Sequence, residues 1–494
     1  MSITYTRSID EIRRIASTQL DQNRRGELGQ FLTPSSIADF MASLFCRYPK
    51  CSRLLDPGAG VGSLSESFIR KFLQETNSGS TLDVTTFEID PLLKSYLDKN
   101  LKELLESSQS ARSAVTHISL ERDFVTEGSF RASFNSGLYT HVILNPPYKK
   151  IAANSQYRKL LHELGIEAPN LYVVFLTLAV LLSEKNGEIV AIVPRSFCNG
   201  TYFRQFRKWL FQNAALVHIH VFESRKKAFQ DDDVLQENII IKLVRSTKQD
   251  SVTVSESKDS TFDDYKEWSV DAQDVINKND TESYIRIPSL KTGDNSNLFL
   301  FTLDELGIEV STGPIVDFRV KSYLLKNPNN ETAPLLYAHH FSDGNFLWPR
   351  VHKKPNAIII SSETKKFLFP KGWYVVTKRF SSKEEKHRIV AGVINPNKLP
   401  TQLYGFENHL NVIHSKKRGL EENLVYGLAL FLNSSIIDSH FRTFSGHTQV
   451  NATDLRTMRF PSAEKLSLFG KWSKTQHQLT QEKIDKFIES YASK

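Results

Sequence analysis

The chain has 494 residues, 40% of them hydrophobic and 24% charged, which is typical of a soluble globular protein. This length excludes a single ordinary hydrophobic core, so we expect two or three domains. The formal net charge of +8 at pH 7 favours a polyanionic partner, because Lys and Arg gain free energy when they displace counterions from phosphate.

Three cysteines, Cys46, Cys51 and Cys198, are an odd and sparse set with neither metal-ligand spacing nor a disulfide framework. This usage fits a reducing, bacterial cytoplasm. Residues 1–5 lack the apolar core of a signal peptide, and the longest apolar run, 171–182, is too short to span a bilayer. We therefore expect a cytoplasmic protein without membrane attachment and without a metal.

Residues 1–45 have a helical pattern, interrupted at 29–34 (Gly-Gln-Phe-Leu-Thr-Pro) before a helix rich in Ala, Met and Phe. From residue 53 to about 244, apolar strands alternate with amphipathic helices, which predicts a mostly parallel sheet of seven strands. The predicted strands are Arg53–Asp56, Val84–Ile89, Ala114–Ile118, His141–Leu144, Glu188–Val193, Val217–Phe222 and Ile239–Val244. The last two are close in sequence and could pair antiparallel at one edge.

A change of composition follows the predicted sheet. Ser, Thr, Asp and Lys dominate residues 248–285, and apolar periodicity fades there, so this stretch is predicted to be a polar linker or insertion. Residues 286–494 alternate short β-like stretches with helices, which predicts a C-terminal mixed α+β domain. The boundaries are thus 1–45, 46–247, 248–285 and 286–494.

An Asn-Pro-Pro-Tyr loop, residues 145–148, follows the buried strand 141–144. Ligands of open α/β folds bind at the carboxyl ends of the strands. The two prolines restrict the backbone, so the Asn145 amide is held in one direction, and the backbone carbonyls remain available as acceptors. The alternative is a proline turn that only ends a strand.

A glycine-rich turn, Gly58-Ala59-Gly60-Val61-Gly62, follows Asp56-Pro57 at the end of the first predicted strand. Glycines permit a tight turn and close approach of a ligand to the backbone, and the following helix offers unpaired N–H groups. The Asp56 carboxylate would repel a pyrophosphate and suits a cationic group. An ordinary strand–helix turn is the alternative.

Two acidic residues follow the next strands. Glu88 ends the second strand, where a carboxylate can accept both hydroxyls of a ribose. Asp123 and Phe124 come near the end of the third βα unit, where a carboxylate could accept an adenine amino group and a ring could pack on the base. An acidic residue at either position alone is more often a surface residue. Because the two acids follow successive strands at the spacing of βα units, a ligand-binding site is favoured.

Taken in order, these motifs resemble the γ-group of DNA adenine-N6 methyltransferases from restriction–modification systems. The resemblance covers residues 25–245 and continues more loosely into Leu-Gly-Ile-Glu-Val-Ser-Thr-Gly (306–313) and Phe-Ser-Gly-His-Thr-Gln-Val-Asn (444–451). It implies a Rossmann-like catalytic domain, S-adenosylmethionine as methyl donor and a C-terminal target-recognition domain. The tail is similar to that of methylases that modify CTGCAG.

The resemblance also assigns roles to residues. It places the cofactor on Phe31, Thr33, Pro34, Asp56, Gly58, Gly60, Gly62, Glu88, Asp123 and Phe124. Phe31 and Thr33 belong to the segment that closes over the methionine end, although Thr33 and Pro34 also suit a helix N-terminus. The catalytic loop is Asn145, Pro146, Pro147 and Tyr148. In this loop the Asn145 amide oxygen and the Pro146 carbonyl accept hydrogen bonds from the target amino group, while Tyr148 and Phe229 contact the base.

An adenine within a duplex must be flipped out of the helix to reach such a loop, at a cost of a few kcal/mol. Contacts with phosphates and the remaining bases offset that cost. The candidate DNA-binding residues are Arg350, Lys353, Lys354, Lys378, Arg379, Lys416, Lys417 and Arg418. Each cluster by itself could equally be a solvated face. The 445–449 stretch could face DNA or pack between domains.

Three rival functions remain open. A protein-glutamine or RNA amino-methyltransferase would use the same loop, but such enzymes usually have small appended domains. A fused restriction nuclease would need a Pro-Asp…Asp/Glu-x-Lys pattern, and residues 384–386 (Glu-Glu-Lys) lie in a charged run instead. A catalytically dead DNA-binding module is disfavoured because every expected position is filled. We expect a monomer that protects the site of a cognate endonuclease without a stable complex.

Overall fold

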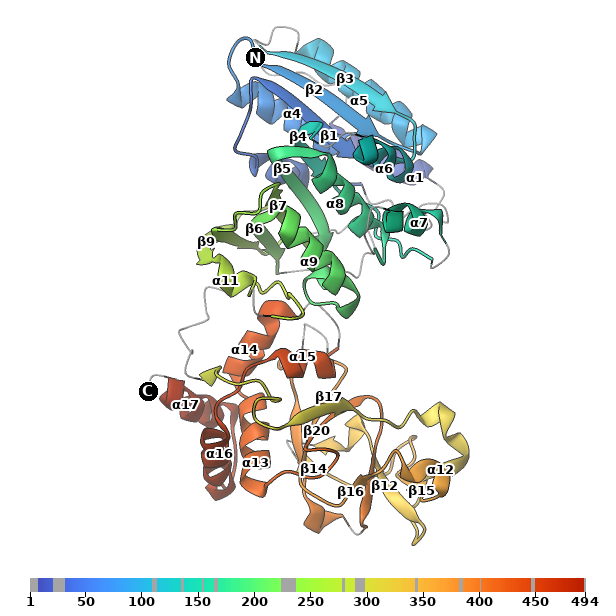
Figure 1. Cartoon of the computed structure of the whole chain (residues 1–494), viewed down its shortest axis with the longest axis vertical. Helices are drawn as coiled ribbons and strands as arrows, with labels where there is room; N and C mark the ends of the chain where they lie inside the picture. The colour runs from blue at the N-terminus through green and yellow to red at the C-terminus, as the bar shows by residue number, and fades with distance from the viewer. Residues whose placement is uncertain are drawn as a thin grey trace. The chain divides into compact units, whose positions relative to one another are not determined.

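The computed structural model describes two compact units, which divide between Pro288 and Ser289 and are described separately below (Figure 1). The described residues are 8–20, 32–108, 113–134, 137–152, 155–163, 168–223, 237–277, 280–288, 298–342, 345–381, 385–399, 401–445 and 449–492. Within these ranges, no helix combines the length and the apolar character that a membrane crossing requires.

Unit 1 contains a sheet in which the described residues form nine strands in the order β3-β2-β1-β4-β5-β7-β6-β8-β9. The strands are β1 (Cys51–Pro57), β2 (Thr81–Phe87), β3 (Ala114–Leu120), β4 (Tyr139–Leu144), β5 (Ser183–Pro194), β6 (Ala215–Phe222), β7 (Asn238–Val244), β8 (Ser251–Ser257) and β9 (Lys266–Asp271). The first five in this order pair parallel, whereas β7 is antiparallel to both neighbours and β9 is antiparallel to β8.

Helices cover both faces of this sheet (Figure 1). The helices of unit 1 are α1 (Ile9–Gln19), α3 (Ser35–Ser43), α4 (Ser63–Glu75), α5 (Pro91–Ser107), α6 (Phe124–Phe134), α7 (Gln156–Glu163), α8 (Leu171–Leu182), α9 (Arg204–Asn213) and α11 (Ala272–Val275). Strand side chains alternate between faces, so Leu55 joins the core under α6, α8 and α9, while Leu54 joins the core under α3, α4 and α5. The fold class is α/β.

All seven predicted strands are present, but the predicted strand count and the predicted linker are wrong. Residues 248–285 contribute β8 and β9, which extend the same sheet to nine strands. Their polar composition reflects partial exposure: in β9, the last strand of the sheet, four of the six residues are exposed and none is buried. The β6–β7 pair is antiparallel as expected, yet β8 and β9 lie beyond it, so it is not an edge pair.

The N-terminal helices are tied to unit 1 by polar contacts. The Asp10 carboxylate of α1 accepts hydrogen bonds from the backbone N–H and the hydroxyl of Ser35, at the start of α3. Farther along, the Glu188 carboxylate on β5 accepts the backbone N–H of Cys46 and pairs with Lys242 at 2.7 Å. Lys242 also donates to the Leu44 carbonyl at 2.6 Å, so both partners of this buried ion pair hydrogen-bond to the chain after α3 and attach it to the sheet.

Unit 2 is a mixed α+β domain. Its described strands are β10 (Glu309–Thr312), β11 (Leu324–Leu325), β12 (Thr332–Leu336), β13 (Phe341–Ser342), β14 (Asn345–Phe346), β15 (Ala357–Ile359), β16 (Phe369–Pro370), β17 (Tyr374–Lys378), β18 (Ala391–Ile394), β19 (Leu403–Phe406) and β20 (Leu410–His414). They form sheets ordered β10-β20-β17-β18, β11-β15-β12-β19-β16 and β13-β14. The helices are α12 (Ser362–Lys365), α13 (Glu422–Leu432), α14 (Ser435–Phe444), α15 (Ala452–Thr457), α16 (Ala463–Thr475) and α17 (Gln481–Ala492).

Helices α13 and α16 approach each other backbone to backbone. A Cβ at Gly427 would overlap the Leu466 carbonyl, and a Cβ at Gly470 would overlap the Asn423 carbonyl. Both contacts are with main-chain atoms, which cannot swing aside as a flexible side chain can. The two glycines therefore permit this helix pair.

We expect Gly427→Ala to lower the free energy of unfolding of unit 2 by about 2 kcal/mol or more, because the added methyl group forces the helices apart. In an unhindered helix the same change would stabilise by about 0.5–1 kcal/mol. Chemical denaturation monitored by circular dichroism measures the difference. Leu468→Ala, at an exposed position of α16, is the control and should shift the midpoint little. A stabilised Gly427→Ala variant would contradict the close packing.

Candidate active site

Parallel pairing brings the carboxyl ends of β1, β2 and β4 to one edge of the sheet. Asp56 pairs with Thr86 of β2, and Leu55 pairs with Val142 of β4. The residues that follow these strands, including Glu88 and Asn145, therefore emerge side by side. This is the edge at which open α/β sheets bind ligands.

The glycine-rich turn between β1 and α4 adopts backbone angles that only glycine takes without strain. Gly58, Gly60 and Gly62 have φ values of 78°, 59° and 91°. The Gly60 N–H donates to Oε2 of Glu88 at 2.8 Å, and Gly62 is the N-cap residue of α4. The turn is thus fastened to the end of β2, with backbone close to the space above the sheet.

Two carboxyl groups are buried behind this turn. Asp56 is fully buried; its Oδ2 accepts the Ser65 hydroxyl at 2.6 Å, and its Oδ1 has no hydrogen-bond partner among the described residues. Oε1 of Glu88 accepts the Asp90 N–H at 2.8 Å. Burial raises the pKa of Asp56 to about 7 and that of Glu88 to about 7, since each charged form loses hydration. A cationic ligand nearby would stabilise the ionised forms.

A cavity opens at this edge and gathers many of the predicted residues. Gly58, Gly60, Glu88, Asp123, Phe124, Asn145 and Pro147 line it. Apolar side chains complete the wall, and the rings of Phe124 and Phe175 lie 5.0 Å apart. A cavity lined by both acidic groups and aromatic rings suits a ligand that combines an aromatic base with polar hydroxyls and a cation.

Asp123 performs a structural task as well as lining the cavity. Its Oδ1 accepts the Thr126 N–H at 2.8 Å at the start of α6, and its Oδ2 accepts the Tyr157 hydroxyl of α7 at 2.8 Å. Helix α7 lies between Lys149 and Leu171 in the sequence, and these two residues are joined by a hydrogen bond from the Leu171 N–H to the Lys149 carbonyl. Tyr157 thereby holds the Asp123 carboxylate in one orientation.

The Asn-Pro-Pro-Tyr loop begins directly after β4, of which every residue is buried. Nδ2 of Asn145 donates to Oγ1 of Thr33 at 3.0 Å, and the Tyr148 hydroxyl donates to Oδ1 of Asn145 at 3.1 Å. The Tyr148 ring is half-buried and packs against the core under α8, and this burial raises the pKa of its hydroxyl. The amide is therefore held from both ends.

The remaining predicted site residues lie close by or cannot be placed. Asp56, Gly62, Thr33, Pro34, Pro146 and Tyr148 do not line the cavity. Pro34 is the N-cap residue of α3, although it supplies no side-chain hydrogen bond there. The predictions for Phe31 and Phe229 lie outside the described residues.

Several cavity residues escaped the sequence analysis: Leu32, Phe87, Ile89, Leu93, Arg122, Val125, Tyr157, Leu171 and Phe175. Leu171 and Phe175 are four residues apart on α8, so they share one helical face, but the continuous apolar run concealed which face lines a cavity. No sequence pattern around Tyr157 predicts that it lines the cavity. Long-range packing brings it to Asp123.

Of the predicted DNA-binding residues, Arg350, Lys353 and Lys354 occupy a loop of unit 2, whereas Lys378 is the last residue of β17 and Arg379 follows it. Arg350 and Lys353 are exposed, whereas Lys354 pairs with Asp317. Arg379 is half-buried, and its guanidinium donates to the Asn408 carbonyl at 3.2 Å. The Val450 N–H donates to the Arg379 carbonyl, so part of the 444–451 stretch lies against this end of β17.

The third basic cluster lies at the other end of the same strands. Lys378 pairs with Leu410, at the start of β20, whereas Lys416, Lys417 and Arg418 follow the end of β20. Lys416 and Lys417 have φ values of 47° and 60° in a tight turn in which Ser415 and Arg418 exchange backbone hydrogen bonds. The structure therefore separates this cluster from Lys378 and Arg379 by the length of a strand, about 16 Å.

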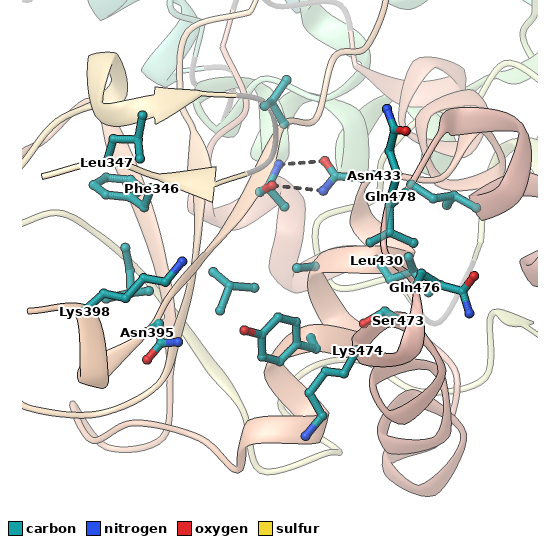
Figure 2. A pocket seen from close by; sticks show the side chains of 18 of the residues that line it. Phe346, Leu347, Asn395, Lys398, Leu430, Asn433, Ser473, Lys474, Gln476 and Gln478 are labelled. Carbon is teal, nitrogen blue, oxygen red and sulfur yellow. Dashed lines mark hydrogen bonds between the residues drawn. The ribbon is translucent and has the colours of Figure 1, made fainter.

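A larger cavity, of about 960 Å³, lies within unit 2 between α13, α16, β14 and β18 (Figure 2). The Asn433 side chain bonds both the N–H and the carbonyl of Ala391 and so joins α13 to β18. Lys398 and Lys474 are among its lining residues. None of the predicted catalytic or cofactor residues that the structure describes lines this cavity, so size alone does not identify the site.

Comparison with known proteins identifies the family. Residues 43–229 match the Eco57I restriction-modification methylase family. The chain is 46% identical to the type II methyltransferase M.BsuBI of Bacillus subtilis over 91% of this chain and 90% of that protein. It is 38% identical to the type II methyltransferase M.PstI of Providencia stuartii over 93% of this chain and 92% of that protein.

The fold has counterparts among solved structures. A chain of the DrdV–DNA complex, determined by cryoEM, aligns with a TM-score of 0.51 at 12% identity, over 94% of this chain and 60% of that one. Identity this low supports the fold alone. The sequence relatives carry the assignment and confirm the expected restriction–modification methyltransferase: the chain belongs to the type II methyltransferases of restriction–modification systems.

Proposed function

We propose that this protein transfers a methyl group from S-adenosylmethionine to N6 of a flipped-out adenine at a specific site in duplex DNA. The observation that carries the proposal is the position of Asn145. It lines the same cavity as Gly58, Gly60, Glu88 and Asp123, so an acceptor for an amine stands beside a pocket suited to the cofactor.

The residues fit this cofactor. Asp56 is fully buried and does not line the cavity, and its Oδ1 has no hydrogen-bond partner among the described residues, so it would attract the ammonium group of the methionine moiety through its charge. Glu88 keeps a second lone pair on each carboxylate oxygen for the ribose hydroxyls, and Asp123 keeps one on Oδ2 for the adenine amino group. Phe124 supplies an aromatic wall. When bound, S-adenosylmethionine supplies an electrophilic methyl group on a sulfonium.

The catalytic loop would activate the target amine by accepting hydrogen bonds from its N–H groups. An exocyclic amine delocalises its lone pair into the ring and is a poor nucleophile. Oδ1 of Asn145 and the Pro146 carbonyl would accept hydrogen bonds from a tetrahedral nitrogen, whose lone pair is free for attack, and would stabilise the transition state more than the ground state. When the amine binds, the Tyr148 hydroxyl would either give up its hydrogen bond to Oδ1 of Asn145 or share this oxygen with the amine. Tyr148 and Phe229 would contact the base.

Unit 2 would recognise the target sequence and hold the duplex. Exposed Arg350 and Lys353, together with Lys378 and Arg379, offer positive charge for phosphates, beside exposed Phe380. Lys354, Lys416, Lys417 and Arg418 remain candidates for the same role. The rival protein-glutamine or RNA substrates are disfavoured, because the long relatives that match both units are type II methyltransferases. We further propose a monomeric, cytoplasmic bacterial enzyme that protects the site of a cognate endonuclease.

The decisive test uses duplex oligonucleotides and S-adenosylmethionine labelled in its methyl group. We expect label in a duplex that contains CTGCAG, and nucleoside mass spectrometry should identify N6-methyladenine. A duplex in which the adenine of this site is replaced should stay unlabelled. Label on cytosine would contradict the adenine assignment, and absence of label from DNA of any sequence would reject the proposed function.

We expect Asn145→Ala to bind the cofactor normally and to lose methyl transfer by on the order of 100-fold or more, because the acceptor that acts in the transition state is removed. Calorimetric binding of S-adenosylhomocysteine and single-turnover methylation separate the two effects. A near-normal rate constant in this variant would refute the role of the amide.

Cofactor affinity should depend on pH through Asp56. Its pKa of about 7 means that the carboxyl is largely protonated at pH 6 and ionised at pH 8. Only the ionised form attracts an ammonium group, so affinity for S-adenosylhomocysteine should rise as pH increases through 7, by at most about tenfold per pH unit for one carboxyl. Asp56→Asn should bind more weakly at pH 8 and show a flatter profile, with the remaining slope abolished by adding Glu88→Gln. An unchanged slope in the double variant would exclude these carboxyls as its source.

A further inference from the structure

Among the described residues, a side-chain hydrogen bond joins the catalytic loop to the N-terminal segment. Oγ1 of Thr33 accepts Nδ2 of Asn145 at 3.0 Å, across 112 residues of sequence, and Thr33 is 6% exposed. We propose that Thr33 is a positioning residue for the methyl-transfer step, which orients the Asn145 amide rather than holding the cofactor. This inference rests on the proposed function.

Thr33 is itself held in place by its neighbours. Leu32 packs with Val61 and Leu93 in a small apolar core. Two residues further on, Ser35 is bound through its N–H and hydroxyl to the Asp10 carboxylate. A side chain between two such anchors presents its hydroxyl from a fixed position, which is what an orienting group requires.

The orientation of the amide decides what the target amine meets. In the structure Nδ2 of Asn145 faces Thr33, and Oδ1 faces the Tyr148 hydroxyl. Rotation of the amide by 180° exchanges the oxygen and the NH2 group, so a donor would then face the amine, which needs an acceptor. The Thr33 hydroxyl accepts a hydrogen bond from Nδ2 in the observed orientation and fixes the position and plane of the amide, so its loss leaves the amide freer to turn.

The cavity supports this role over the one expected from sequence. Leu32 lines the cofactor cavity, whereas Thr33 does not. The Thr33 hydroxyl is instead directed at the group proposed to accept the amine. Its effect should therefore fall on the rate constant of methyl transfer and leave the affinity for cofactor nearly unchanged.

Thr33→Val replaces the hydroxyl by a methyl group of the same shape and is the direct test. We expect the single-turnover rate constant at saturating DNA and cofactor to fall about fivefold, the equivalent of one hydrogen bond of about 1 kcal/mol. The dissociation constant of S-adenosylhomocysteine should change less than about twofold. Thr33→Ser should restore most of the rate. Thr76→Val, which removes a hydroxyl bonded to Phe72 at the far end of α4, is the matched control and should turn over normally.

A second measurement requires no turnover. In protein labelled with ¹⁵N-asparagine, the side-chain amide resonance of Asn145 can be assigned by its absence from Asn145→Ala. Thr33→Val should shift this resonance and speed its hydrogen exchange, while Thr76→Val should not. An inactive wild-type protein would count against the proposed function, and the resonance would still decide the contact.

Two results would overturn the inference. In the first, Thr33→Val weakens cofactor binding but keeps the wild-type rate constant at saturation, which would make Thr33 a cofactor residue. In the second, Thr33→Val leaves both the rate constant and the Asn145 resonance unchanged, which would show that the amide needs no such partner.

Discussion

The parallel pairing of β1 with β2 and β4 is the constraint on which the site depends. Asp56, Glu88 and Asn145 lie far apart in sequence and share no local structure. They meet because parallel strands end at the same edge of a sheet, and the register Leu55–Val142 sets how far each strand extends. A slip of one residue would turn every side chain to the other face, so the buried cores on both sides of the sheet also protect the site.

The same edge carries an energetic cost. Asp56 and Glu88 are buried, and both have raised pKa values, so the ionised forms are disfavoured in the protein alone. In the proposed function, the ligand's own charge and hydroxyls offset this cost. A site that is unfavourable when empty and favourable when filled couples ligand binding to stability.

Contacts between distant segments complete the site. Thr33 reaches Asn145 from the N-terminal segment, and Tyr157 reaches Asp123 from α7. In both cases a hydroxyl orients a carboxylate or an amide that is proposed to touch a reactant. Precision at this edge thus comes from residues outside the loops that carry the motifs, because a side chain with one partner can still rotate.

The sequence by itself determined the seven core strands and the order of the loops, because apolar runs and glycine or proline turns are local signals. It also indicated the family through the Asn-Pro-Pro-Tyr loop. Only the tertiary structure decided the rest. Strands β8 and β9 are partly exposed, so their polar composition resembled a linker. The contacts of Thr33 and Tyr157 join distant segments, and the separation of Lys378 and Arg379 from Lys416–Arg418 follows from antiparallel pairing of β17 with β20. No local pattern encodes such contacts, since they arise when segments far apart in sequence pack together.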